Sequence, residues 1–128
     1  MSPNARKRLI KRLKERAEIT IECEPDSLQI EGNCSAIGPE EDAETLAWIV
    51  NELNRGNEWA WCAVKVTATF EGMSASDYLG GCSYESEHAF KDPHGYYPDM
   101  VNRAIEGLAD AIVDDLARNA TLRRAISY

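Results

Sequence analysis

The chain has 128 residues, of which 44% are hydrophobic and 8% aromatic, and it carries a formal net charge of −8 at pH 7. A chain of this length and composition can bury one core, so we expect a single folded domain over residues 1–128 and not a disordered chain. It contains no run of about 18 apolar residues, which argues against a transmembrane helix. The basic N-terminus lacks the apolar stretch of a secretion signal, so we expect a cytoplasmic protein.

The charge is divided unevenly along the chain. Residues 1–17 contain seven of the fourteen Lys and Arg residues and one acid, Glu15, which gives +6. Residues 18–128 contain seven basic and 21 acidic residues, which gives −14. This pattern predicts a basic N-terminal helix (1–17) joined to an acidic body (18–128), with two contact surfaces of opposite charge.

The first 32 residues predict a helix followed by a β-hairpin. Ser2 can cap the helix, Pro3 suits its first position, and a narrow apolar stripe follows at Leu9, Ile10, Leu13 and Ala17. In residues 18–32, apolar and polar residues alternate on both sides of Pro25-Asp26-Ser27. This alternation predicts two strands joined by a turn, with Leu28 and Ile30 on the second strand.

Residues 40–56 predict a second helix, with acids in the first turn and Gly56 after its end. Its inward face should hold the apolar residues Ala43, Leu46, Ala47, Val50 and Leu53.

Residues 57–84 predict a second hairpin, with Glu71-Gly72 as a two-residue turn. If Phe70 faces Met73, Lys65 pairs with Tyr78 and Trp59 with Tyr84. One face then holds Val64, Val66, Phe70, Met73 and Leu79, and the other gathers Trp59, Trp61, Lys65, Tyr78 and Tyr84. A bulge at Gly80-Gly81 could break this register. Asp77 would point to the apolar side unless a bulge turns it outward or a partner meets it there.

Residues 85–97 predict an exposed loop, and Pro98 opens a last helix over residues 98–120. The resulting order is α-β-β-α-β-β-α. It predicts an α+β fold in which three main helices cover one face of a four-stranded antiparallel sheet built from two hairpins.

The aromatic face of the second hairpin allows two interpretations. If it is open, Trp59, Trp61, Tyr78 and Tyr84 form a row that could stack on an unpaired base or anchor a protein partner. Alternatively, the N-terminal helix or the 85–97 segment covers the rings and makes a second small core.

The residues with catalytic or metal-binding chemistry give weak patterns. The four cysteines, Cys23, Cys34, Cys62 and Cys82, contain no C-x-x-C pair, and we interpret them as small core residues. Cys82, His88 and His94 have a spacing outside the usual zinc patterns. Cys82 or Ser83 with His88 would supply a nucleophile and a base, but no nucleophile elbow is present. We therefore expect no catalytic residue, no metal and no cofactor, with a small metal-dependent or cysteine enzyme as a lesser alternative.

Two sets of charged residues are candidates for partner contacts. The acids Glu41, Asp42, Glu44, Asp110 and Asp114 form either a solvated face or a surface that imitates the phosphates of a nucleic acid. On the first helix, Arg6, Lys7, Arg8, Lys11 and Arg12 could contact phosphates, each contact making binding more salt-sensitive. They could equally lie against the acidic body of this chain or of a second copy, and we favour that protein contact.

Three motifs, "GNEWAWCAVKVT", "YLGGCSY" and "GYYPDMV", resemble small uncharacterised proteins encoded by bacteriophages and other mobile elements. The resemblance covers roughly residues 55–108 and transfers no residue role. It implies a context in which small acidic proteins block host defence machinery such as CRISPR and restriction systems. We therefore predict a non-enzymatic binding protein that inhibits a host protein or nucleoprotein complex through its acidic and aromatic surfaces. A nucleic-acid-binding module using residues 6–16 is the alternative.

Overall fold

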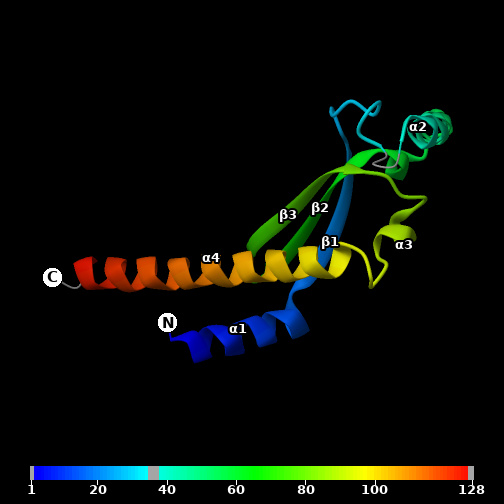
Figure 1. Ribbon diagram of the computed structural model, residues 1–128. Coiled ribbons are helices and arrows are strands. Elements are labelled where there is room, and N and C mark those ends of the chain that lie inside the picture. Colours follow the sequence, from blue (N-terminus) through cyan, green and yellow to red (C-terminus); the bar gives the residue numbers. More distant parts are fainter. Residues whose placement is uncertain (1, 35–37, 127–128) are drawn as a thin grey trace. The chain divides into compact units, whose positions relative to one another are not determined.

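The computed structural model describes residues 2–34 and 38–126, and only the backbone at residues 39, 122, 123 and 126 (Figure 1). The elements in chain order are α1 (Pro3–Arg16), β1 (Glu18–Pro25), α2 (Pro39–Asn54), the 3₁₀ turn η1 (Glu58–Ala60), β2 (Cys62–Phe70), β3 (Met73–Cys82), α3 (Glu87–Phe90) and α4 (Tyr97–Ile126). The fold class is therefore α+β, and α1, α2, α4 and the second hairpin lie where the sequence predicts them. None of the described helices is both long enough and apolar enough to cross a membrane.

The sheet is antiparallel and has three strands in the order β1-β2-β3, so the prediction of four strands is wrong. The missing strand is the segment containing Leu28 and Ile30, which forms bends and a turn. Side chains hold this segment in place of a strand ladder. Asp26 accepts a hydrogen bond from the Leu28 N–H at 2.9 Å, and the Trp61 indole N–H donates to the Leu28 carbonyl at 3.0 Å. These bonds satisfy the backbone locally, so residues 26–32 do not form a hairpin with β1.

The β2–β3 hairpin has the predicted turn and register. Glu71 and Gly72 both have positive φ, 49° and 78°, as a two-residue type I′ turn requires. The hydroxyls of Thr67 and Ser76 are 2.8 Å apart, and the Tyr84 N–H donates to the Trp59 carbonyl at 2.8 Å. Gly81 also has a positive φ of 63°, but the Trp59–Tyr84 pairing persists beyond it.

The chain divides into two compact units. Unit 1 comprises residues 1–20, 66–77 and 100–128, and unit 2 comprises residues 21–65 and 78–99. Unit 1 contains eleven basic and eight acidic residues, a net charge of +3. Unit 2 contains three basic and fourteen acidic residues, a net charge of −11. Charge is therefore segregated by unit and not only between the first 17 residues and the remainder. The prediction of one domain stays a prediction.

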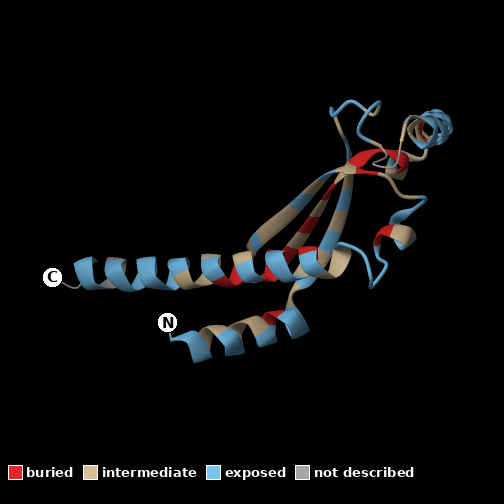
Figure 2. Ribbon diagram, in the orientation of Figure 1, coloured by how far each residue is buried: buried red, intermediate tan, exposed pale blue. Residues whose placement is uncertain are grey.

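The core of unit 1 is formed by α1, α4 and the strand residues that they cover. Ser2 caps α1 by accepting from the Ala5 N–H at 3.2 Å, as predicted. Leu13 of α1 is fully buried against Ile105 and Leu108 of α4. Figure 2 shows that the buried positions of α4 lie in its first half, whereas residues 114–121 are exposed. Leu116 is accordingly 55% exposed.

The core of unit 2 is smaller and includes the packing of α2 on η1. Ile49 of α2 is fully buried with Ala60 and Trp61. The predicted inward face of α2 is therefore only partly right. Leu46 and Leu53 are half-buried, but the other three predicted residues, Ala43, Ala47 and Val50, are exposed. The reason is that α2 contacts the fold along one narrow line through Ile49, and most of its circumference is left to solvent.

The segment predicted to be an exposed loop contains α3. Ser86 caps this single helical turn by accepting from the Ala89 N–H at 3.2 Å. The turn places Phe90 in the core, where it is 1% exposed. The loop prediction was wrong here because one aromatic residue, and no periodic pattern, anchors the segment.

Candidate functional site

The aromatic residues of the second hairpin do not form an open row. Trp59, Tyr84 and Tyr97 surround Phe90, with ring centroids 5.5, 5.3 and 5.6 Å from that of Phe90. Trp59 and Tyr84 also meet edge to face at 6.5 Å. Burial raises the pKa of the Tyr84 phenol. The 85–97 segment thus covers the rings and makes a second small aromatic core in unit 2.

Trp61 is covered by α2 and by the segment that contains Leu28. It does not begin a strand, because residues 58–60 form η1 and β2 starts at Cys62. Its side chain is 5% exposed, packed on Ile49 and Ala60, and bonded through its indole N–H to the Leu28 carbonyl. Two of the predicted contact residues, Trp59 and Trp61, therefore pack against residues of their own unit.

Lys65 and Tyr78 remain near the surface of unit 2. The Lys65 ammonium lies 5.6 Å from the Tyr78 ring centroid and 3.9 Å from a Glu22 carboxylate oxygen. The interaction with Tyr78, and then the charge of Glu22, raises the pKa of Lys65. Tyr78 is 62% exposed. This pair engages its own neighbours and presents one face of the phenol ring to solvent.

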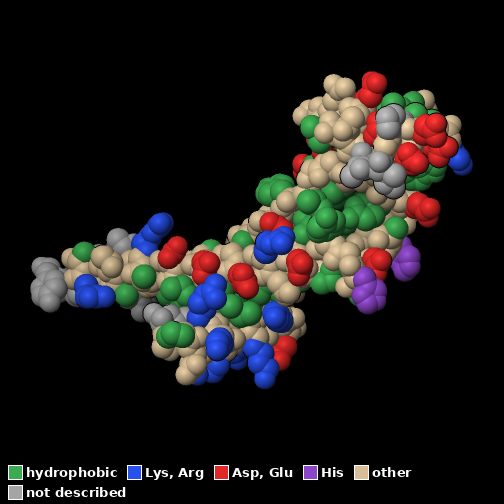
Figure 3. Space-filling model, in the orientation of Figure 1, with side chains coloured by type: hydrophobic (Ala, Val, Ile, Leu, Met, Phe, Trp, Pro, Cys, Tyr) green, Lys and Arg blue, Asp and Glu red, His purple; other side chains and the backbone are tan. Residues whose placement is uncertain are grey.

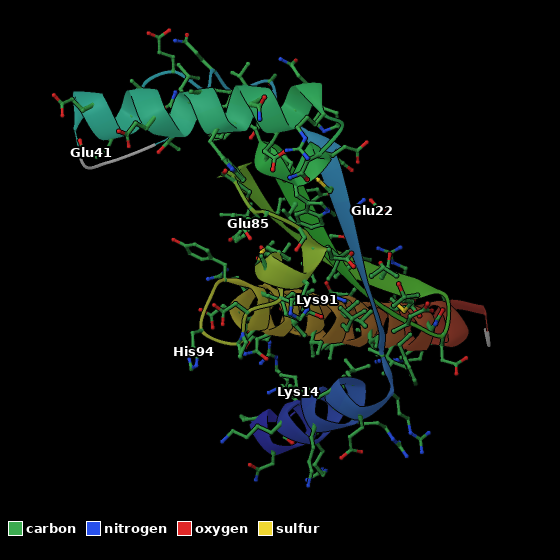
Figure 4. All side chains as sticks on the ribbon, turned by 90° about the vertical axis from the view of Figure 1, so that its right-hand side faces the viewer. Lys14, Glu22, Glu41, Glu85, Lys91 and His94 are labelled. Carbon is green, nitrogen blue, oxygen red and sulfur yellow. The ribbon has the colours of Figure 1, made fainter. Side chains whose placement is uncertain are left out.

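A groove in unit 2 brings together two of the predicted contact residues and adds others. It is an open depression of about 420 Å³ between α2 and the segment that follows β3. Its lining consists of Glu44, Thr45, Trp48, Ser83, Tyr84 and Glu85. Trp48 is 38% exposed, a large apolar side chain left on the surface of α2. Figure 4 labels Glu85, which follows β3, and Glu41 near the start of α2.

The groove has local supports and unpaired carboxylates. The Asn57 amide donates to the Glu85 carbonyl at 3.1 Å, which fixes the backbone of one wall. Within the parts of the chain that the structure describes, neither Glu44 nor Glu85 has an ion-pair partner. An aromatic wall beside two uncompensated carboxylates suits a cationic group. We take this groove as the candidate functional site.

The remaining predicted acids are in different environments. Glu41 is exposed, whereas Asp42 is half-buried and accepts from the Cys34 thiol at 3.2 Å. Asp114 lines a shallow hollow of unit 1, of about 270 Å³, together with Met73 and Arg118. Asp110 pairs with Arg6 at 3.1 Å. The predicted acids are therefore divided between the two units, with Glu41, Asp42 and Glu44 in unit 2 and Asp110 and Asp114 in unit 1.

Asp77, which the sequence placed toward the apolar side, has a partner. Its carboxylate lies 3.3 Å from the Arg103 guanidinium of α4, and its side chain is 24% exposed. Both residues belong to unit 1. The ion pair explains how an acid is accommodated beside a core strand.

The cysteine thiols and the histidine imidazoles of unit 2 lie in different environments. Cys62 and Cys82 are buried, and burial raises the pKa of both thiols, that of Cys82 to about 11. The Cys82 thiol donates to the Leu79 carbonyl at 3.3 Å. His88 and His94 are exposed, and Figure 4 shows His94 pointing away from its loop. Among the described residues no three His, Cys, Asp or Glu side chains are arranged to hold a metal ion.

The basic residues of α1 are mostly exposed. Arg6 is the member that faces α4, where it bonds to Asp110 through Nε and Nη2. The others, Lys7, Arg8, Lys11 and Arg12, are exposed together with Lys14 and Arg16. Figure 3 shows Lys and Arg side chains gathered over α1.

Sequence reasoning missed Trp48 and Glu85 in the groove. Trp48 lies outside the face that was predicted to be inward, and a tryptophan on the outer face of a helix was the signal that could have identified it. Comparisons with protein-family models, curated proteins and solved structures each gave no match, so no relative assigns a role to any of these residues.

Proposed function

We propose that this chain is a non-enzymatic binding protein that contacts a basic surface of another protein through the groove of Glu44, Trp48, Tyr84 and Glu85. The observation that carries the proposal is the coexistence, in one groove, of a half-exposed tryptophan and two carboxylates without ion-pair partners in the described residues. An Arg or Lys side chain would stack on the aromatic wall and neutralise the carboxylates.

The charge of unit 2 supports a basic partner. Its net charge of −11 would attract a positively charged surface and accelerate encounter. Tryptophan and tyrosine are enriched among the few anchor residues that dominate the binding energy of an interface. The motif resemblance to phage proteins favours host defence machinery as the class of partner. Such machinery holds nucleic acid in basic grooves.

A cationic peptide tests the chemistry of the groove. We expect an eight-residue arginine peptide to bind the full chain and to lose about tenfold in affinity on E44Q/E85Q or W48A, because these remove the charge and the ring. The matched control is E24Q/E31Q, which removes two exposed carboxylates of unit 2 outside the groove. An equal loss of affinity in E44Q/E85Q and E24Q/E31Q would mean that the peptide responds to net charge alone. It would contradict binding in the groove.

Affinity capture from a bacterial host lysate tests the partner. The wild-type chain should retain one protein species that W48A does not retain. If the two baits recover the same proteins, the groove is not the contact surface.

A further inference from the structure

The outward face of α1 forms a strongly basic surface that the groove of unit 2 does not use. The helix Pro3–Arg16 carries seven basic residues and one acid. Apart from Arg6, none of these cations has a carboxylate partner among the residues that the structure describes. Within unit 1, ion pairing therefore neutralises one residue of the basic helix, and the other six positive charges have no carboxylate partner in the described part of that unit.

The spacing of these six residues gives the surface a definite form. Lys7, Lys11 and Lys14 follow one another at four and three residues, so they form one row along the helix. Arg8, Arg12 and Arg16 follow at four residues and form a second row. The two rows lie on opposite sides of the outward face. A helix of 14 residues is about 21 Å long, so each row can meet several phosphates of a nucleic-acid strand.

The packing of α1 decides against a membrane surface. A helix that lies on a bilayer inserts its apolar face among the acyl chains. On α1 that face is already occupied, because Leu13 is fully buried and Leu9 and Ile10 pack against the same core of unit 1. What α1 offers is charge alone. Its unit has a net charge of +3, so the acids of unit 1 do not cancel the surface.

The residue types on α1 decide between duplex and single strand. Proteins that bind single strands stack bases on aromatic side chains, and α1 contains no aromatic residue. Two parallel rows of cations on a helix about 10–12 Å across match the two phosphate strands that border the major groove of B-DNA, which is about 12 Å wide. The deep, narrow major groove of duplex RNA does not admit a helix in this way.

We propose that α1 binds the phosphate backbone of double-stranded DNA, without base readout, through Lys7, Arg8, Lys11, Arg12, Lys14 and Arg16. This proposal is independent of the groove of unit 2.

Titration of the full chain with a labelled duplex of about 20 base pairs tests the proposal. Six phosphate contacts predict a slope of about −5 in log K against log salt, and about a 10³-fold loss of affinity between 50 and 200 mM salt. Because no base is read, two duplexes of unrelated sequence should bind equally. Tighter binding to a single strand or to duplex RNA, or no binding to either DNA duplex at 50 mM salt, would overturn the proposal.

Paired variants separate the surface from net charge. R8Q/R12Q should lower the slope to about −4 and weaken duplex binding at least tenfold, because two of six contacts are lost. The control R55Q/K91Q removes two exposed cations of unit 2 and should leave the affinity within about twofold. Glutamine is a good helix former and all four positions are exposed, so both proteins should keep the circular dichroism of the wild type. Equal effects of the two variants would overturn the assignment to α1.

A vesicle assay provides the remaining test. Sedimentation with vesicles containing about 30% anionic lipid should leave the chain in the supernatant at 150 mM salt, where screening weakens surface attraction and the apolar face of α1 is buried. Binding to vesicles in place of DNA would overturn the proposal in favour of a membrane surface.

Discussion

The Asp26 carboxylate joins the end of β1 to the end of β3 within unit 2 by accepting a backbone hydrogen bond from Gly81 at 2.6 Å. Its other oxygen accepts from the Leu28 N–H at 2.9 Å. One carboxylate thus fixes both the turn that ends β1 and the backbone of Gly81, whose φ is 63°. These bonds lower the pKa of Asp26, the bond from Gly81 contributing most.

We predict that D26A lowers the free energy of unfolding by about 1 kcal/mol at pH 7, because two hydrogen bonds to a charged, half-buried group are lost. A lowered pKa in the folded state means that the stabilisation is complete above the ordinary value of about 4 and is lost as the pH falls through the folded value. Urea unfolding at pH 7, 5 and 3 measures this. The difference from the wild type should be constant between pH 7 and 5 and smaller at pH 3. If the stability difference between D26A and the wild type grew toward pH 3, the pKa of Asp26 would not be lowered in the folded state.

We predict a larger loss for F90A. Phe90 is 1% exposed and contacts three aromatic rings, so its truncation should cost about 3–5 kcal/mol. Denaturant unfolding followed by tryptophan fluorescence reports it, because Trp59 is one of the three neighbours. Y96A is the control, since Tyr96 is 60% exposed and its loss should cost less than about 0.5 kcal/mol. Comparable losses of stability in F90A and Y96A would mean that Phe90 of α3 is not part of a packed aromatic core.

These elements show what local sequence can predict. The start of α1 and the turn at Glu71-Gly72 were predictable because a cap, a proline and a glycine determine them within a few residues. The conformation of the segment that contains Leu28 and Ile30 was not predictable in this way. Their alternation is compatible with a strand, but the hydrogen bonds that Leu28 donates to Asp26 and accepts from Trp61 decide the outcome, and Trp61 lies 33 residues away from Leu28.

The candidate site was less accessible from sequence for a related reason. Tyr84 and Glu44 were predicted as contact residues, but their common groove depends on which face of α2 turns inward. The contact of Ile49 with η1 determines that face, and η1 was itself predicted to be the start of a strand. An apolar pattern with residues on several sides of a helix does not specify the rotation of the helix.

Glu71 is a position where substitution should stabilise the protein. Its φ of 49° is a left-handed conformation that costs a glutamate about 1 kcal/mol, whereas Asn-Gly suits this turn. We therefore expect E71N to raise the free energy of unfolding by about 0.5–1 kcal/mol in thermal or urea unfolding. G72A, at φ 78°, should lower it by a similar amount. The turn assignment is wrong if both variants shift stability in the same direction.

The Asp77–Arg103 ion pair should give a small but measurable coupling. Arg103 Nη1 lies 3.3 Å from Asp77 Oδ2. The Arg103 side chain is 59% exposed, so solvent screens much of the attraction between the two charges. A double-mutant cycle with D77N and R103Q should give a coupling free energy of about 0.5 kcal/mol, smaller in 1 M NaCl. A coupling of zero at low salt would show that Arg103 does not stabilise the Asp77 carboxylate.

The cysteines should react slowly in the folded protein, and their order of reaction follows from burial. All four are free thiols, and burial is the largest cause that raises the pKa of each. Because the thiolate is the nucleophile, we expect a disulfide reagent at pH 8 to modify half-buried Cys23 and Cys34 before buried Cys62 and Cys82.

For Cys82, whose pKa is about 11, the rate should rise about tenfold per pH unit between pH 7 and 9 without a plateau. Mass spectrometry after timed quenching identifies the modified residue, and denaturant should expose all four thiols at once. Rapid modification of Cys82 in the folded state, at a rate that levels off below pH 8, would instead indicate an activated thiolate. The cysteine-enzyme alternative would then replace the binding function proposed above.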